Sequence, residues 1–123
     1  MNASLFVYGT LMEGQAQEGL LAGLARTSAS TRGALWDLPA GYPALSPGSD
    51  VVHGELVAGL EDRMLALLDR YEGVDEGLFE RVEIEVKVGL RASAAWVYVM
   101  NDPRRRGARR VVSGRWVQTR RRG

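Results

Sequence analysis

Leu5-Phe6-Val7-Tyr8-Gly9-Thr10-Leu11 is the stretch around which the rest of the chain is organised. Its first four residues form a continuous apolar and aromatic run, which predicts a short strand buried on both faces. Gly9 follows directly, and because glycine has no Cβ it allows a sharp turn where the strand ends. Backbone N–H groups at such a turn can point outward together and form a concave site for a carboxylate or phosphate. An ordinary exit from a strand into a turn is the simpler alternative.

The composition is that of a single globular domain. The chain has 123 residues, of which 46% are hydrophobic and 25% charged, so it can bury a core and lacks the features of a disordered chain. The absence of cysteine excludes disulfides, thiolate catalysis and Cys-based metal sites. With His53 as the one histidine, a His-based zinc site or a Ser-His-Asp triad is hard to assemble. The sequence shows no membrane span and no targeting segment, so we expect a soluble cytoplasmic protein without a metal site.

The net charge of +1 conceals two oppositely charged parts. Residues 1–103 contain 7 Lys+Arg and all 15 Asp+Glu, whereas residues 104–123 contain nine Arg and no acid. We therefore expect a domain over residues 1–103 and a solvated, arginine-rich tail over residues 104–123. Such a tail attracts polyanions by counterion release. No aromatic residue apart from Trp116 alternates with its arginines, so specific nucleic-acid binding is not indicated.

One helix and several strands are predicted within residues 1–103. The segment from Glu61 to Tyr71 is the clearest helix, and Gly73 is placed to end it. The helix carries apolar residues at three- and four-residue spacing, which predicts one buried face: Leu60, Met64, Leu67, Leu68 and Tyr71.

Alternation of apolar and charged residues predicts a strand from Glu80 to Val88, with an antiparallel partner from Ala94 to Met100. Further strands are expected near Trp36 and from Val51 to Val57, and a turn is expected at Pro47-Gly48. This order predicts an α+β fold, with a curved mixed sheet or small β-barrel and one main helix.

Five short motifs occur in a fixed order along residues 4–100: Val7-Tyr8-Gly9-Thr10-Leu11, Gly-Tyr-Pro-Ala-Leu over residues 41–45, His53-Gly54-Glu55-Leu56, Leu68-Asp69-Arg70-Tyr71-Glu72-Gly73 and Phe79-Glu80-Arg81. Their combination resembles the γ-glutamylcyclotransferase-like superfamily, specifically its small AIG2-like members. The resemblance implies that fold and an intramolecular reaction. The α-amine of a γ-glutamyl group attacks its own γ-carbonyl, which forms 5-oxoproline and expels an amine or peptide. It implies no cofactor, because one molecule carries both reacting groups.

The resemblance also assigns roles to residues of this chain. It makes Glu72 the catalytic acid/base, and it assigns substrate binding to the loop of Tyr8, Gly9, Thr10 and Leu11. The position of Glu72 agrees with this role, since the negative end of a helix and any burial both raise the pKa of a carboxyl group. A solvated surface carboxylate is the simpler alternative.

The expected partner is a small-molecule γ-glutamyl substrate, without a nucleic acid or a membrane, and the sequence indicates no oligomeric state. A non-catalytic small-molecule binding module on the same fold is the alternative function. A third possibility, an accessory protein that binds RNA or a membrane surface through its basic tail, is disfavoured because aromatic and basic residues do not alternate.

Other residues with chemically useful side chains are assigned to the core or the surface. His53 and Tyr71 are expected to be structural, Trp36, Trp96 and Tyr98 to be core residues, and Asp37, Asp69, Asp75 and Glu76 to be solvated. One motif departs from the family pattern. Many small members carry Ser-Gly-Asp-Trp near the end of the chain, whereas this sequence has Ser113-Gly114-Arg115-Trp116. A cation there in place of a carboxylate puts the substrate and the activity in question.

Overall fold

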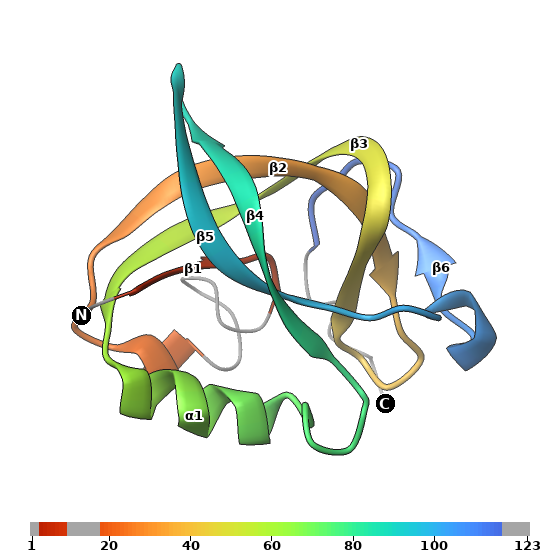
Figure 1. Ribbon diagram of the computed structural model, residues 1–123. Helices are drawn as coiled ribbons and strands as arrows, with labels where there is room; N and C mark the ends of the chain where they lie inside the picture. The colour runs from red at the N-terminus through yellow and green to blue at the C-terminus, as the bar shows by residue number, and fades with distance from the viewer. Residues whose placement is uncertain (1–2, 10–17, 117–123) are drawn as a thin grey trace.

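The computed structural model describes residues 3–9 and 18–116. Within these ranges the elements occur in the order β1 (Ala3–Val7), η1 (Glu18–Leu21), β2 (Arg26–Asp37), β3 (Pro43–Leu60), α1 (Asp62–Tyr71), β4 (Glu80–Val88), β5 (Arg91–Val99), η2 (Arg104–Arg106) and β6 (Arg109–Arg110). Figure 1 shows α1 along one side of a strongly curved sheet, whereas the hairpin of β4 and β5 projects from the opposite side.

The six strands of the described residues form one mixed sheet. Their order is β3-β1-β5-β4-β2-β6, and an additional pairing joins β3 to β2. The sheet curves toward closure, but β1 and β5 share only the residue pair Leu5–Trp96, and β2 and β4 share only Ser30–Lys87. The predicted α+β class with a curved mixed sheet and one main helix is confirmed, and the sheet is not a clean barrel.

β1 is buried on both faces, as its apolar run predicts. Successive side chains of a strand point to opposite faces, so Leu5 and Val7 join the hydrophobic cluster that contains the buried residues of α1. Phe6 and Tyr8 join a second cluster on the other face. Complete burial of a side chain such as Leu5 or Phe6 contributes about 1.5–3 kcal/mol, so β1 stabilises both halves of the core.

The hairpin of β2 and β3 contains an irregularity where the sequence predicts a turn. Gly33 pairs with Asp50, but the next residue, Ala34, pairs with Ser46. Residues 47–49 are therefore extra residues on the β3 side, as in an enlarged β-bulge. The predicted turn at Pro47-Gly48 is wrong, because pairing with β2 continues on both sides of it.

The alternation over β4 gives the predicted antiparallel hairpin. β4 pairs with β5 along its whole length, from Glu80–Val99 to Val88–Arg91. β5 begins at Arg91 rather than at the predicted Ala94, because backbone pairing continues up to the two-residue turn.

The bounds of α1 agree with the prediction, but its buried face is rotated. Leu65 and Leu68 are buried, whereas Leu67 and Tyr71 are 60% and 48% exposed. Leu65 lies three residues before Leu68, so these two side chains share one face of the helix. The interpretation of Tyr71 as a core residue is wrong, because its side chain is exposed.

The arginines of residues 104–116 are exposed, as a solvated segment requires, but the backbone and Trp116 of this segment pack on the sheet. β6 pairs with the end of β2, where Trp36 lies opposite Arg110 and Asp37 opposite Arg109. The guanidinium groups of Arg104 and Arg110 lie 5.5 and 5.2 Å from the centre of the Trp36 ring. Trp116 is only 4% exposed and belongs to the second core cluster.

Candidate active site

Tyr8 joins the end of β1 to two neighbouring strands. Its hydroxyl group donates a hydrogen bond to the carbonyl oxygen of Tyr98 at 2.6 Å and accepts one from the backbone N–H of Leu45 at 3.1 Å. The N–H of Met100 in turn donates to the carbonyl oxygen of Leu45 at 2.8 Å. Burial raises the pKa of the Tyr8 hydroxyl well above its ordinary value, and the nearby Glu72 raises it further, so the group stays protonated. These bonds hold the last residue before the turn at Gly9 in one position.

Gly9 occupies a position with no room for a side chain. A Cβ atom there would lie 2.3 Å from Cγ of Pro43, far closer than two carbon atoms can approach. The ring of Pro43, at the beginning of β3, therefore lies directly against the turn, which explains why glycine stands here. Thr10 and Leu11, the other two residues predicted to bind substrate, lie outside the described residues.

Glu72 is the residue at which α1 ends. Its backbone N–H still donates to the carbonyl oxygen of Leu68 at 2.8 Å, and Gly73 follows with a φ of 69°. This left-handed residue after the last helical turn is the usual glycine termination of a helix. Burial raises the pKa of the Glu72 carboxyl to about 7. At neutral pH, Glu72 is therefore present in both protonation states.

Glu72 acts electrostatically on the hydroxyl groups of Tyr8 and Tyr98. Burial is the main cause of the raised pKa of both Tyr8 and Tyr98, but the Glu72 carboxylate contributes to each. A charge acts on both hydroxyl groups in this way only from nearby. Two hydrogen bonds of Tyr98, from the Tyr8 hydroxyl to its carbonyl oxygen and from its own hydroxyl to Asp69, join the end of β1, the last part of β5 and the end of α1.

Asp69 belongs to the same region, although the sequence analysis placed it in solvent. Nε and Nη2 of Arg81 donate to its two carboxylate oxygens at 2.8 and 3.2 Å, and the Tyr98 hydroxyl donates to it at 2.8 Å. Burial alone would raise the pKa of Asp69, but the hydrogen bonds from Arg81 and Tyr98 and the charge of Arg81 outweigh it and lower this pKa. The Arg81 guanidinium also lies 4.5 Å from the centre of the Trp96 ring. In the sequence, the feature that pointed to Asp69 was its position three residues before Glu72, which places it one helical turn away.

Three further residues lie around this region or at the surface. Tyr42 contacts Phe79 with ring centres 6.3 Å apart, on the loop that ends at Pro43. The backbone N–H of His53 donates to the carbonyl oxygen of Gly114 at 2.8 Å, so this residue helps to hold the C-terminal segment. Arg115, the departure from the family motif, is exposed.

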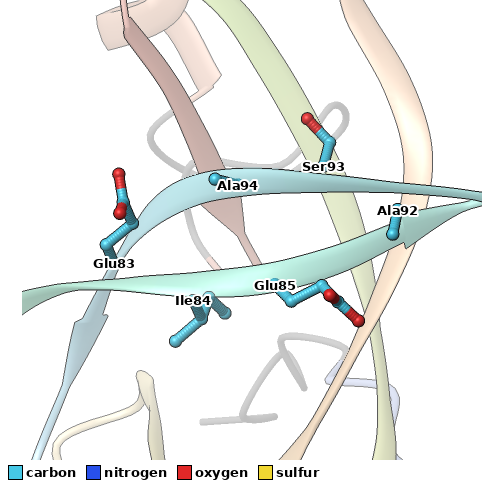
Figure 2. A pocket seen from close by; sticks show the side chains of 6 residues that line it. All are labelled: Glu83, Ile84, Glu85, Ala92, Ser93 and Ala94. Atoms are coloured by element: carbon cyan, nitrogen blue, oxygen red, sulfur yellow. The ribbon is translucent and has the colours of Figure 1, made fainter.

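An open hollow of about 350 Å³ lies on the β4–β5 hairpin. Figure 2 shows the side chains that line it: Glu83, Ile84, Glu85, Ala92, Ser93 and Ala94. None of these residues belongs to the cluster around Glu72. Among residues 3–9 and 18–116, no group of three or more His, Asp or Glu side chains is arranged to hold a metal ion. No helix in the described part of the chain is long and apolar enough to cross a membrane.

Comparison with known proteins gives consistent results. The family model described as gamma-glutamyl cyclotransferase, AIG2-like, matches residues 5–118. The gamma-L-glutamyl-butirosin B gamma-glutamyl cyclotransferase of Niallia circulans is 35% identical over 104 residues, which cover 80% of this chain and 67% of that protein.

Two solved structures share the fold. YkqA from Bacillus subtilis superposes with a TM-score of 0.75 at 26% identity, over 94% of this chain and 40% of YkqA. The chain therefore spans less than half the length of that relative. An AIG2-like protein from Mus musculus superposes with a TM-score of 0.71 at 26% identity, over 80% of this chain and 77% of the mouse chain. The family match over almost the entire described fold, together with these relatives, confirms the resemblance, and the chain belongs to the gamma-glutamyl cyclotransferase, AIG2-like family.

Proposed function

We propose that this protein is a cofactor-independent γ-glutamylcyclotransferase that converts a γ-glutamyl amine or peptide into 5-oxoproline and the free amine. One observation carries the proposal: the partly buried carboxyl group of Glu72, at the end of α1, has a pKa that desolvation raises to about 7. A group that must first accept and then donate a proton works best with a pKa near the operating pH. Glu72 meets this requirement.

Glu72 acts first as a base. It removes a proton from the α-ammonium group of the substrate, and the free amine attacks the γ-carbonyl carbon. A new C–N bond forms, and the π electrons of the carbonyl group move to its oxygen. Because both reacting groups belong to one molecule, a site that holds the substrate folded supplies much of the rate acceleration.

Glu72 then acts as an acid. It returns a proton to the leaving nitrogen while the original C–N bond breaks and the carbonyl group forms again. The ring nitrogen loses its second proton, and the released amine ends as an ammonium ion. The reaction therefore consumes no water and involves no change in oxidation state, and the charge of the substrate reappears on the product amine.

The turn at Gly9 holds the substrate in this proposal. Its backbone N–H groups bind the α-carboxylate of the substrate, a role that the family resemblance also assigns to Thr10 and Leu11. The hydroxyl group of Tyr8 already has a donor and an acceptor, so Tyr8 contributes by fixing the turn. The neutral, buried hydroxyl groups near Glu72 keep the acid/base in a surrounding of low polarity.

A panel of γ-glutamyl compounds tests the proposal. The panel contains three compounds: γ-L-glutamyl-butirosin B, a γ-glutamyl dipeptide, and lysine whose side-chain amine carries a γ-glutamyl group. The relative from Niallia circulans is named for the first of these. We expect 5-oxoproline and free amine in equal amounts from at least one of them. An α-glutamyl dipeptide is the control, since its γ-carboxyl group carries no amine to expel. Binding of these compounds without formation of 5-oxoproline would favour the alternative, a non-catalytic binding module.

A further inference from the structure

Tyr98 lies between the two parts of the candidate site. Its carbonyl oxygen accepts the hydrogen bond from the Tyr8 hydroxyl at 2.6 Å, which fixes the strand that leads into Gly9. Its own hydroxyl group donates to Asp69 at 2.8 Å, and Asp69 lies on α1 one turn before Glu72. One residue of β5 therefore contacts both the element that carries the acid/base and the element that carries the turn.

The contact between Tyr98 and Asp69 is held from a third side. Arg81 of β4 binds both oxygens of the Asp69 carboxylate, at 2.8 and 3.2 Å, and its guanidinium stacks on Trp96 of β5 at 4.5 Å. Two-point binding between arginine and a carboxylate constrains orientation as well as distance. Among the described residues, no other ion pair joins α1 to the sheet.

We propose that Tyr98 is a positioning residue, which sets the distance between Glu72 and the turn at Gly9. It does so through two hydrogen bonds: its hydroxyl group donates to Asp69, and its carbonyl oxygen accepts from the hydroxyl group of Tyr8. This inference rests on the proposed function, because it assigns Tyr98 a part in the cyclisation by Glu72. A substrate bound at the turn must present its amine to Glu72 at hydrogen-bond distance. A displacement of about 1 Å at such a contact can reduce the rate by about a hundredfold.

Tyr98→Phe tests the proposal, since it removes the hydroxyl group and keeps the ring and the backbone carbonyl. We expect a fall in kcat of about ten- to a hundredfold, with KM changed by less than about threefold. Tyr71→Phe is the matched control, because it makes the same chemical change on an exposed residue of α1. We expect its kcat to equal that of the unaltered protein. A merely structural role for Tyr98 would lower the melting temperature without this separation of kcat from KM.

A second readout does not need activity. The charged and titratable groups near Glu72 include Tyr8 just after β1, Asp69 on α1, Arg81 on β4 and Tyr98 on β5. Release of the end of α1 admits water to Glu72, so its pKa should fall from about 7 toward the ordinary value. Carbon-13 NMR of the glutamate carboxyl groups measures this, with the Glu72 resonance identified by its loss in Glu72→Gln. We expect the fall in Tyr98→Phe and not in Tyr71→Phe.

Asp69→Asn probes the same link from the other side and serves if Tyr98→Phe fails to fold. If both residues act through one contact, the kcat of the double variant should equal that of the more impaired single variant. Multiplying effects would overturn the proposal, as would a Tyr98→Phe protein with the kcat and Glu72 titration of the unaltered chain. If the unaltered protein forms no 5-oxoproline, the proposed function fails, while the NMR titration still decides whether Tyr98 positions Glu72.

Discussion

Glu72 owes its pKa of about 7 to burial. The sequence predicts two causes, the negative end of the helix and burial, and burial is the cause that the structure identifies. The residue nevertheless needs the helix, because α1 ends at Glu72 and thereby carries its side chain into the region of Tyr8 and Tyr98. The helix thus places the side chain of Glu72, whereas burial sets its pKa.

Glu72→Gln should abolish turnover while preserving binding. Glutamine keeps the size and much of the hydrogen-bonding capacity of glutamate but cannot take up a proton near neutral pH. We expect kcat to fall by about two to four orders of magnitude. Calorimetric titration with a γ-glutamyl substrate should give nearly unchanged affinity, because the turn at Gly9 holds the α-carboxylate. A Gln variant with normal turnover would remove Glu72 from the mechanism.

The same substitution should change stability in a pH-dependent way. The pKa of Glu72 is higher in the folded protein than its ordinary value of 4.5, so the folded state binds the proton more tightly than the unfolded state. The ionised carboxylate therefore destabilises the fold above about pH 7, and this cost disappears as the pH falls to about 4.5.

We expect Glu72→Gln to be more stable than the unaltered protein at about pH 8, by at most about 3 kcal/mol, and equally stable at about pH 4. Urea unfolding at both pH values measures the difference. Glu76→Gln, an exposed position in the following turn, is the control and should show no such dependence. An equal difference at both pH values would contradict desolvation of Glu72.

The C-terminal end of α1 is the element on which the site depends most. Gly73 ends the helix with a φ of 69°, and a Cβ atom there would lie 3.2 Å from Cβ of Leu78. The backbone N–H of Val74 donates to the carbonyl oxygen of Asp69, and that of Leu78 donates to the carbonyl oxygen of Gly73. The chain after the helix therefore folds closely against the end of α1. A change in this termination moves Glu72 directly.

Gly73→Ala should destabilise the protein and lower its activity together. The left-handed conformation costs a residue with a Cβ atom about 1–2 kcal/mol, and the contact with Leu78 adds to this. Gly77→Ala is the matched control, since its φ is 75° but a Cβ atom there would meet nothing within 4 Å. We expect urea unfolding to show a larger loss for Gly73→Ala, and only this variant to lose kcat. Equal losses would mean that the packing around Gly73 contributes nothing.

At the scale of the whole molecule, the C-terminal segment completes the second hydrophobic cluster. The indole N–H of Trp116 donates to Asp37 at 3.1 Å, and the ring packs in the cluster that contains Phe6 and Tyr8. The arginines of η2 and β6 are exposed, and Arg110 among them pairs with Asp50. The arginines of the segment lie on its exposed surface, whereas the buried ring of Trp116 holds the segment against the core.

Trp116→Ala should therefore cost about 3–5 kcal/mol, which is typical for removal of a buried aromatic ring. Val112→Ala, four residues earlier and 86% exposed, should change the free energy of unfolding by less than about 0.5 kcal/mol. Chemical unfolding of the two variants measures both values. A small effect of Trp116→Ala would contradict this anchoring role and favour the solvated tail that the charge pattern predicts.

Local patterns in the sequence determined β1, the bounds of α1 and the β4–β5 hairpin. Each depends on residues that are neighbours in the chain: an apolar run before Gly9, a helical repeat before Gly73, and strict alternation over Glu80–Val88. The candidate acid/base and turn were assigned by the family resemblance, which also depends on short motifs of neighbouring residues.

The tertiary structure alone decided which charged and aromatic residues meet. Asp69 finds Arg81 and Tyr98 at separations of 12 and 29 residues, and Trp116 finds Asp37 at a separation of 79. Burial of Glu72, and with it a pKa near neutrality, depends on the same long-range packing. The local sequence around a carboxylate on a helix is the same whether the group is solvated or paired with a cation. Only the packing of distant strands against the helix removes water from the group and brings the cation to it.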